Sequence, residues 1–496
     1  MARTQTVGVL GGGAMGAGIA QLCAEAGFAV RLCARDAQAA DFARRMLARK
    51  VEKGQLSASA GAAAADAIAP VGGVAALAGC ELVIETALAD RDATQQALSG
   101  LEQVLASDAV IALNTSAHPV SVLARDARHP QRVAGLHFFE PAPLMRVVEV
   151  IAGLRTDPAL LPRLCALVER LGHAPVVVRD SPGFVVNHIG RALLTEGARI
   201  VAEQVATPAL VDRVARETLG LRMGPFELLD LIGLDISLPV MEQLHADFRH
   251  EPRLRPPAFL ALRAAAGLHG RRSGAGFHLP SAPAETAQPP APAAREPWPA
   301  VWIDPSDAAL HDAVRDHLAP HGVRLDTGSA PAAASLCVVM PLGSDASACV
   351  AARGLDAART VAVDAVSGLR PLALLMAPPG LPRAPREAAL ALFGAAGPVA
   401  WIADSPGFIA QRLLAALVNL ACDVAQQGVA APHDLDRVVQ LALGYPHGPL
   451  AWGDRFGAGR VLQVLRAQHA DGDPRDRPSP WLRRRAALGL PLATPD

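Results

Sequence analysis

The amino-acid sequence predicts an α/β protein, with an N-terminal doubly wound parallel sheet followed by duplicated all-α helical modules. Three observations lead to this prediction. Short apolar runs alternate with helix-length segments up to about residue 180, long helical patterns follow, and the pentapeptide Asp180–Phe184 recurs at Asp404–Phe408. Alternation of strands and helices is typical of a parallel sheet covered on both faces, and recurrence at a fixed offset is typical of a duplicated unit.

The composition sets the protein class. The chain has 496 residues, 51% of them hydrophobic, which is enough for several cores. Its 46 basic and 47 acidic residues give a net charge of -1, so we predict no nucleic-acid partner. Seven scattered cysteines suit a reducing compartment. The cysteines are never spaced C-x-x-C, so we predict no metal site. Because there is no secretory signal and no apolar run of transmembrane length, we predict a cytoplasmic protein without a membrane segment.

The N-terminal strands are predicted from short apolar runs. These runs are Thr6–Leu10, Phe28–Cys33, Glu81–Glu85, Ala109–Leu113, Val133–Phe138 and Val147–Ile151. Between the first two, Ala14–Glu25 has the periodicity of an amphipathic helix. We therefore expect parallel strands joined by crossover helices in this part of the chain.

The whole chain divides into five predicted segments. Residues 1–180 form the sheet domain, and residues 181–280 form the first helical module, which would bind substrate or dimerise. A Pro- and Ala-rich linker spans 281–300, a degenerate α/β segment spans 301–400, and the second helical module spans 401–496.

The two helical modules share further landmarks. Gly224-Pro225 recurs as Gly448-Pro449, and Asp230 recurs as Asp454, all at an offset of 224 residues. Asn187 in the first module corresponds to Gln411 in the second, which has no glycine fingerprint or His/Glu pair. We therefore expect the second module to be structural.

A glycine-rich motif predicts the cofactor. Gly11, Gly13 and Gly16 form G-x-G-x-x-G after a strand and at the start of a helix. In a Rossmann-type domain the first glycine allows a tight turn, the second lets a pyrophosphate approach, and the third packs the helix against the strand. We assign this loop, with Ala14 and Met15, to dinucleotide binding. A glycine-rich turn without a ligand is the alternative.

The end of the second strand bears on the choice between NAD and NADP. An acidic residue there would bind the adenosine ribose. The sequence has Ala34 followed by Arg35 and Asp36. A small residue followed by arginine is more typical of a 2′-phosphate site, which favours NADP, whereas Asp36 on the ribose or Arg35 on the adenine would keep NAD.

Two polar residues in predicted strands suggest acid–base chemistry. His137 ends one strand, and Glu149 lies inside the apolar run that follows. A buried carboxylate is costly unless it is paired, and an imidazole paired with it is held in one tautomer and helped to accept a proton. Such a dyad suits deprotonation of an alcohol. The alternatives are a core or surface histidine and a solvated carboxylate on an edge strand.

Two further residues are candidates for substrate contact. Ser116 follows the strand Ala109–Leu113, and ligands bind beyond the carboxyl ends of parallel strands. Asn187 lies at the start of the first helical module, from which its amide can reach a substrate. An ordinary Ser/Thr turn and a helix-surface asparagine are the alternatives.

Together these residues resemble the (S)-3-hydroxyacyl-CoA dehydrogenase family. The matching motifs are GGGAMGAGIAQ (11–21), NTS (114–116), VAGLHFFEPAPLMRVVEV (133–150), DSPGFVVN (180–187), MGPFELLDLIG (223–233) and GRRSGAGFH (270–278). The second module, ending in GYPHGPLAWGDRFG (444–457), resembles the long two-module bacterial members, such as the phenylacetate-pathway 3-hydroxyadipyl-CoA dehydrogenases. The resemblance implies NAD(P)-dependent oxidation of a 3-hydroxyacyl-CoA to the 3-ketoacyl-CoA, in fatty acid β-oxidation or phenylacetate degradation.

The resemblance also implies a role for each candidate. His137 would take the proton of the C3 hydroxyl, Glu149 would orient His137, and Ser116 and Asn187 would hold the hydroxyl or thioester oxygen. Acyl-CoA would lie between the sheet domain and the helical module, and the two modules would pair within the chain or between subunits. Lys53, or Lys50, would meet the CoA phosphates, although surface solubility accounts for both lysines equally well.

Several positions depart from the family pattern. The ribose-binding Asp is Ala34, the Asn beside the nicotinamide is Glu140, and the Glu and Lys after the fourth strand are Ala89 and Thr94. We therefore keep two alternatives open, a dehydrogenase of a free 3-hydroxy carboxylate and a catalytically weakened nucleotide-binding protein.

Overall fold

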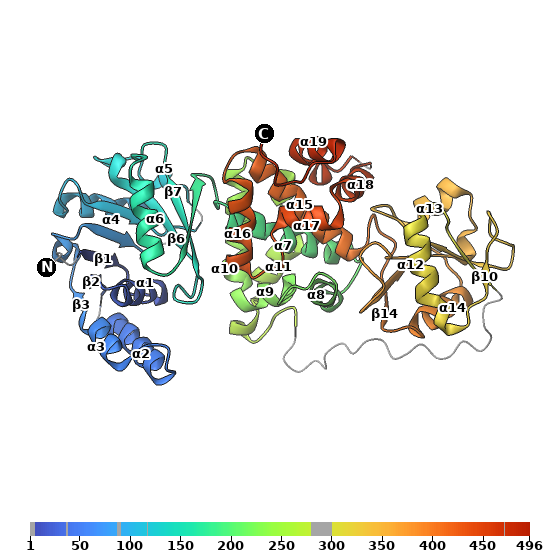
Figure 1. Ribbon diagram of the computed structural model, residues 1–496, viewed down its shortest axis with the longest axis horizontal. Coiled ribbons are helices and arrows are strands. Elements are labelled where there is room, and N and C mark those ends of the chain that lie inside the picture. The colour runs from blue at the N-terminus through green and yellow to red at the C-terminus, as the bar shows by residue number, and fades with distance from the viewer. Residues whose placement is uncertain (1–4, 36–37, 87–90, 117, 279–299, 471) are drawn as a thin grey trace. The chain divides into compact units, whose positions relative to one another are not determined.

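The chain forms two compact units. The computed structural model describes residues 5–35, 38–86, 91–116, 118–278, 300–470 and 472–496 (Figure 1). Unit 1 lies within residues 1–188 and 424–444, and unit 2 within residues 189–423 and 445–496. The predicted linker lies almost entirely outside the described residues.

Unit 1 is built on one large sheet, whose described strands number eight. These are β1 (Thr6–Leu10), β2 (Ala29–Cys33), β3 (Ile68–Val71), β4 (Leu82–Glu85), β5 (Val110–Leu113), β6 (Val133–Phe138), β7 (Val147–Ala152) and β8 (Ala174–Arg179). Their spatial order is β3-β2-β1-β4-β5-β6-β7-β8. The doubly wound sheet is confirmed, but β3 and β8 were not predicted. β3 has four residues and contains a proline, whereas β8 includes an apolar run, Ala174–Val178, that could have been predicted.

One pair of strands departs from the predicted parallel arrangement. β6 and β7 run antiparallel, while the other neighbouring pairs of this sheet are parallel. Residues 139–146 connect them, and a parallel crossover needs about a dozen residues or more. The short connection therefore forces the chain to reverse, and it brings the sixth and seventh strands side by side as a hairpin-like pair.

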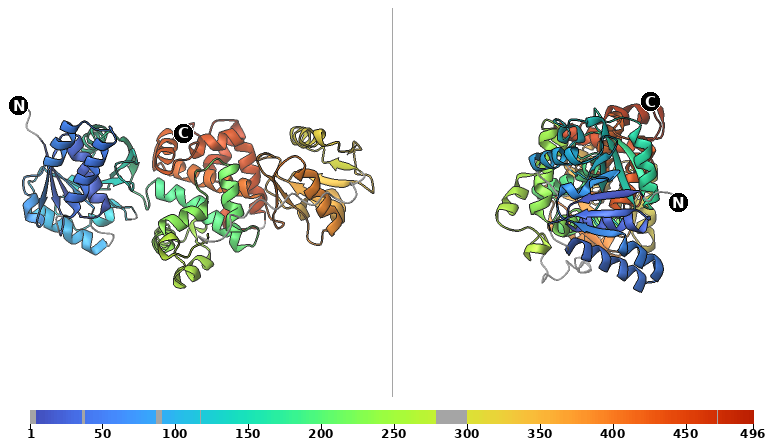
Figure 2. Two further views of the ribbon diagram at one scale, coloured as in Figure 1. Left: turned by 90° about the horizontal axis from the view of Figure 1, so that it is seen from below. Right: turned by 90° about the vertical axis from the view of Figure 1, so that its left-hand side faces the viewer.

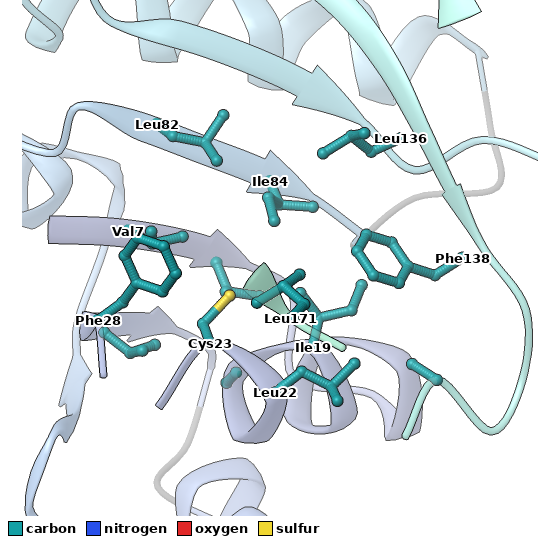
Figure 3. Close-up of a cluster of buried hydrophobic side chains, with 14 of the residues drawn as sticks. Val7, Ile19, Leu22, Cys23, Phe28, Leu82, Ile84, Leu136, Phe138 and Leu171 are labelled. Atoms are coloured by element: carbon teal, nitrogen blue, oxygen red, sulfur yellow. The ribbon is translucent and has the colours of Figure 1, made fainter. Parts of the chain in front are cut away.

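Helices cover both faces of this sheet (Figure 2). They are α1 (Ala14–Glu25), α2 (Gln38–Glu52), α3 (Ala58–Asp66), α4 (Arg91–Val104), α5 (Val120–Leu123) and α6 (Leu160–Arg170), and unit 1 also contains α16 (Pro432–Leu443). Alternate strand residues such as Val7, Ile84 and Leu136 pack with Ile19 of α1 in one apolar core (Figure 3). The strand residues that alternate with these face the opposite side of the sheet.

Unit 2 contains both helical modules. The first has α7 (Val186–Ala202), α8 (Pro208–Glu217), α9 (Pro225–Ile232), α10 (Leu234–Asp247) and α11 (Ala258–Ala265). The second has α15 (Ile409–Gln426), α17 (Pro449–Phe456), α18 (Ala458–His469) and α19 (Pro480–Leu488). Gly224 and Gly448 are the N-caps of α9 and α17, and Asp230 and Asp454 each accept backbone amides from a following loop. The repeated landmarks therefore have the same structural roles.

Buried ion pairs join the two modules within the chain. Arg412 of α15 is 1% exposed, and its Nε donates to Oε1 of Glu196 on α7 at 2.7 Å. Arg199, also on α7, pairs with Asp476 near the end of the second module at 2.9 Å. Breaking a buried pair leaves an uncompensated charge, so such pairs specify one arrangement of the helices. Pairing within the chain is one of the two arrangements that the sequence left open.

The segment between the modules forms a second, smaller sheet. It has β9 (Val301–Ile303), β10 (Leu325–Asp326), β11 (Leu336–Val339), β12 (Thr360–Val363), β13 (Ala373–Met376) and β14 (Val399–Trp401), with α12 (Ala308–Leu318), α13 (Ala346–Arg353) and α14 (Arg383–Gly394). The order is β10-β9-β11-β12-β13-β14, and β12–β13 is the antiparallel pair, followed by parallel β13–β14. This is a shortened copy of the first sheet, so the duplication includes the sheet as well as the helices.

Candidate active site

The glycine motif forms an open cradle at the start of α1. Gly11 has a φ of 134°, and a Cβ on Gly16 would lie 2.0 Å from the carbonyl oxygen of Gly11. Gly13 is the N-cap of α1 and has no side-chain cap, and a Cβ there would meet nothing within 4 Å. The first amides of α1 therefore face open space, which is what a pyrophosphate needs. These residues fit a dinucleotide.

The end of β2 lies beside this cradle. A Cβ on Gly12 would come within 2.8 Å of the Ala34 Cβ, so Ala34 is close to the glycine loop. Arg35 is exposed at the end of the strand, and Asp36 lies outside the described residues. Arg35 is therefore placed where it can meet the adenosine end of a nucleotide, and the choice between NAD and NADP stays a prediction.

His137 and Glu149 face each other across the antiparallel pair. They are directly opposite in the register of β6 and β7, and Nδ1 of His137 lies 2.6 Å from Oε2 of Glu149. Their exposed fractions are 4% and 0%. Both side chains project from the face that carries Gly135, which packs on Val120 of α5, and not from the face that forms the apolar core.

Backbone amides complete the environment of Glu149. Its Oε1 accepts from the amides of Val185 at 2.9 Å and Val186 at 3.1 Å, at the start of α7. A carboxylate that accepts several hydrogen bonds at a helix N-terminus is stabilised as the anion. Glu149 can then only accept from the imidazole, so the proton of His137 lies on Nδ1 and Nε2 is left as the proton acceptor.

Aromatic side chains surround the imidazole. The ring of Phe139 lies 4.4 Å from the His137 ring, centroid to centroid, and the ring of Phe184 lies at 5.7 Å. Phe184 is fully buried, and its φ of 50° turns the chain sharply into α7. These rings reduce the access of water to the dyad.

Ser116 and Asn187 are brought together at the same edge of the sheet. Nδ2 of Asn187 donates to the backbone carbonyl of Ser116 at 2.9 Å. Asn114, two residues before Ser116, accepts the amide of Phe138 on its Oδ1 at 2.8 Å. The loop after β5 is thus attached to the end of β6 and to the start of α7. Ser116 itself is exposed, as a substrate contact requires.

The remaining candidates lie outside the dyad and the loop after β5. Lys53 is exposed just after the end of α2, and Lys50 forms an ion pair with Glu25 at 2.5 Å. Glu140 is exposed directly after Phe139. Thr94 is buried on α4, and Ala89 lies outside the described residues.

Sequence reasoning missed three parts of this site. The amides of Val185 and Val186 leave no trace in a sequence because any residue supplies a backbone N–H. Asn114 was singled out only as part of a polar turn. Asp180 accepts backbone amides at the start of α5, and the signal for it was present, because the same aspartate recurs at position 404.

The corresponding edge of the second sheet is filled by its own side chains. Gln411, the counterpart of Asn187, is fully buried; its Nε2 donates to Asp364 at 2.9 Å and its Oε1 accepts the amide of Gly343 at 2.9 Å. Burial raises the pKa of Asp364, and its hydrogen bonds act in the opposite direction. At the end of β9, Asp304 is buried and paired with Arg353.

The second sheet also lacks an open helix N-terminus at the nucleotide position. The carboxylate of Asp307 accepts the amides of Ala309 at 3.0 Å and Leu310 at 3.1 Å, at the start of α12. These amides of α12 occupy the position of the first amides of α1, which no side chain caps. The structural role predicted for the second half is consistent with this filled arrangement.

Two kinds of feature are absent from the described part of the chain. No helix there is both long and apolar enough to cross a membrane. No group of three or more His, Cys, Asp or Glu side chains there is arranged to hold a metal ion.

Known proteins match this chain over its whole length. Residues 6–181 match the NAD binding domain of 3-hydroxyacyl-CoA dehydrogenase, and residues 183–279 and 407–493 each match its C-terminal domain. The chain is 33% identical over 495 residues to a 3-hydroxyadipyl-CoA dehydrogenase of Escherichia coli K12, covering 98% of each protein. It is 35% identical over 274 residues to a probable 3-hydroxybutyryl-CoA dehydrogenase of Bacillus subtilis, covering 54% of this chain and 95% of that one.

Solved structures agree with these matches. A crystal structure of 3-hydroxybutyryl-CoA dehydrogenase from Escherichia coli K12 superposes with a TM-score of 0.83 at 31% identity, covering 98% of this chain and 99% of that one. The (S)-3-hydroxybutyryl-CoA dehydrogenase of Ralstonia eutropha matches 56% of this chain with a TM-score of 0.54 at 33% identity. The chain belongs to the 3-hydroxyacyl-CoA dehydrogenase family, whose members are NAD-binding oxidoreductases that act on a CH–OH group.

Proposed function

We propose that this protein oxidises a (S)-3-hydroxyacyl-CoA to the 3-ketoacyl-CoA, with His137 as the general base. The observation that carries the proposal is the buried pair of His137 and Glu149 at the ligand-binding edge of the sheet, with Nδ1 and Oε2 at 2.6 Å. The names of its relatives support a 3-hydroxyadipyl-CoA or 3-hydroxybutyryl-CoA substrate.

The proton is handled by the dyad. The glycine loop and the open N-terminus of α1 would hold NAD, which would supply the acceptor for the hydride of C3. Nε2 of His137 removes the proton of the C3 hydroxyl as the carbonyl forms, because Nδ1 already donates to Glu149. The carboxylate of Glu149 stabilises the imidazolium that results, while the amides of Val185 and Val186 keep that carboxylate in place.

The substrate oxygen is held by the neighbouring loop and helix. The hydroxyl of Ser116 and the amide of Asn187 lie on segments joined by the hydrogen bond from Asn187 to the Ser116 carbonyl. Both groups can donate to an oxygen on which negative charge develops. Phe139 and Phe184, packed around the imidazole, keep water from competing for the proton.

We place Lys53, Glu140 and Arg35 at the periphery of the bound ligands. Lys53 and Arg35 are exposed cations that suit CoA or nucleotide phosphates, and Glu140 is an exposed carboxylate close in sequence to the dyad. The proposal also includes a cytoplasmic location, which is supported by seven free cysteines.

The first prediction is that purified protein oxidises NADH or NADPH with acetoacetyl-CoA or a 3-oxo dicarboxylyl-CoA. The loss of absorbance of the reduced nicotinamide measures the rate. The ratio of the rates with NADH and NADPH shows which cofactor the residues Ala34 and Arg35 favour. His137→Gln should lower kcat by about 100-fold or more, because it removes the general base.

A matched control removes a different buried imidazole. The hydrogen bonds that the structure shows for His173 go to the backbone carbonyls of Leu171 and Ala142, and its ring meets Phe138 edge-on at 6.4 Å, on the core side of β6. His173→Gln should therefore leave kcat within about twofold in a folded protein. Near-normal turnover by folded His137→Gln would contradict the base assignment. Turnover of a free 3-hydroxy carboxylate with no turnover of any CoA thioester would replace the proposed substrate.

A further inference from the structure

The carboxylate of Asp180 caps a helix that lies far away in the sequence. Oδ1 accepts the amide of Val120 and Oδ2 accepts the amide of Ser121, each at 2.7 Å and across about sixty residues of chain. These are the first amides of α5, whose own N-cap, Pro119, supplies no side-chain hydrogen bond. A charged acceptor on two amides at a helix N-terminus is one of the stronger hydrogen-bonding arrangements in proteins.

This cap fixes one end of the loop that carries Ser116. α5 begins shortly after Ser116, and the other end of the loop is attached to β6 through the hydrogen bond from Phe138 to Asn114 at 2.8 Å. Between these two attachments, the Ser116 carbonyl accepts from Asn187 at 2.9 Å. The position of Ser116 relative to the sheet therefore depends on where Asp180 holds α5.

The same aspartate begins the segment that orients the dyad. Asp180 directly follows β8, and the chain then turns through Gly183 and Phe184, both at positive φ, into α7. The amides at that turn hold Glu149. One side chain thus connects the loop of Ser116 to the turn that orients the dyad, although it contacts neither the dyad nor Ser116 itself.

We propose that Asp180 is a positioning residue for the reaction, because it sets the placement of the Ser116 hydroxyl relative to His137. Its effect on catalysis passes through α5 and the loop after β5. This inference rests on the proposed function of the dyad. It predicts that loosening the cap lowers kcat more than it raises KM, because a misplaced donor is missed most in the transition state.

The chain contains its own matched control. Asp404, the counterpart of Asp180 in the second half, caps α13 through the amides of Ala346 at 2.7 Å and Ser347 at 3.0 Å. The two carboxylates accept the same pair of helix amides, although Asp404 also accepts the Ser347 hydroxyl at 2.5 Å and α13 is capped again by Asp345. The second cap lies beside a sheet edge that is filled by Gln411 and Asp364. Loss of either cap should therefore lower stability, and only loss of the first should affect the reaction.

The experiment compares Asp180→Asn with Asp404→Asn in the full chain. An asparagine keeps the volume and one acceptor, but its amide group turns a donor toward the second backbone N–H. We expect Asp180→Asn to lower kcat by about 10- to 100-fold, with KM for acyl-CoA and the Kd of NADH changed less than about threefold. The pH profile of kcat should keep its position, since Glu149 keeps its amides. Asp404→Asn should lower Tm as well and leave kcat unchanged.

A second variant keeps the test decisive if Asp180→Asn folds poorly. Asp180→Ser also removes the charged cap of two amides, without turning an amide donor toward the backbone, so its kcat should likewise fall below that of wild type. Equal kcat losses in the Asp180 and Asp404 variants, or a kcat within twofold of wild type in folded Asp180→Asn, would overturn the inference. If wild-type protein itself turns over no 3-oxoacyl-CoA, the proposed function has failed, and that outcome is distinct from an active wild type with an unaffected Asp180 variant.

Discussion

At the residue scale, the chemistry depends on which proton each group of the dyad carries. Glu149 is fully buried and accepts from the imidazole of His137 and from the amides of Val185 and Val186. Donors occupy both of its oxygens. The hydrogen bonds of the dyad thus form one connected pattern, from the two backbone amides through Glu149 to Nδ1 of His137.

This pattern predicts the effect of Glu149→Gln. A glutamine would turn its amide group toward either His137 or the two backbone amides, and in the first case it would force the wrong tautomer of the imidazole. We expect kcat to fall by about 100- to 10,000-fold, with KM for acyl-CoA changed much less. Steady-state kinetics with the preferred cofactor measures both parameters.

Glu102 offers the control for this variant. Its carboxylate accepts the backbone amides of Arg128 and His129 at 2.9 and 2.8 Å, far from the dyad in sequence and without a histidine side chain as partner. Glu102→Gln should leave kcat unchanged. If the two glutamine variants lost activity equally, the special role of Glu149 would be wrong.

At the element scale, a chain reversal creates the site. His137 and Glu149 meet because β6 and β7 are antiparallel and in register. The sequence indicated both residues and the burial of Glu149. Their hydrogen bond was inferred because both strands were expected to lie beside the dinucleotide site. The direction of β7 could have been predicted from the short connection at residues 139–146, which is too short for a crossover. The position of the amides of Val185 and Val186, at the start of α7, could not have been predicted, because it depends on how the helix docks.

The second sheet contains a buried acid at the matching edge. Asp364 is 2% exposed, and its Oδ1 accepts Nε2 of Gln411 and the amide of Ser367. Because burial raises the pKa of Asp364, the folded state binds its proton more tightly than the unfolded chain does. The contribution of Asp364 to the free energy of unfolding therefore decreases as pH rises from the ordinary aspartate pKa of about 3.9 through the raised value.

Asp364→Asn should remove this dependence. The variant should gain stability relative to wild type as pH rises, by about 1.4 kcal/mol for each unit by which the pKa of Asp364 is raised. Urea unfolding across the acid and neutral range measures the difference. Hydrogen bonds from Ser335, Ala332 and Gly328 lower the pKa of Asp326 in the same sheet, so Asp326→Asn should show the opposite trend. Parallel trends in the two variants would contradict the assignment.

At the scale of the whole molecule, the described residues contain two copies of one architecture, and the proposed active site lies in the first copy. The sequence revealed the repeated helical landmarks, because Asp180, Gly224 and Asp230 recur at a constant offset. It did not reveal that the repeat extends to the sheet at residues 301–401, because the strands of a buried sheet need only be apolar, and many sequences meet that need. The boundaries of the five predicted segments stay a prediction.

The two copies differ in their capacity for a nucleotide. The N-terminus of α1 is open at Gly13, whereas that of α12 is capped by the carboxylate of Asp307, close to the buried Asp304. A phosphate would meet negative charge at the second position. Equilibrium binding of NADH should therefore saturate at about one nucleotide per chain, because Asp307 already occupies the amides of Ala309 and Leu310 that a second phosphate would need.

A single substitution can reproduce the closed state in the first copy. Gly13→Asp places a carboxylate at the N-cap of α1, where a Cβ meets nothing within 4 Å. The variant should lose NADH binding while its Tm is maintained or raised, because aspartate is a favoured N-cap residue. Saturation at two nucleotides per wild-type chain, or residual stoichiometric binding by Gly13→Asp, would show a second site.

The intrachain duplication changes how this molecule can vary. In a symmetric dimer of identical chains, every substitution appears in both subunits and so reaches both active sites at once. Here the two copies are encoded separately, and a substitution in the second sheet leaves the first untouched. The second copy can therefore collect changes such as Gln411 and Asp307 that would abolish activity in the first, provided that it still packs through Arg412 and Glu196. If the second half is structural, as we predict, selection on it acts through stability, and its sequence should diverge faster at the positions that match the proposed substrate contacts of the first copy.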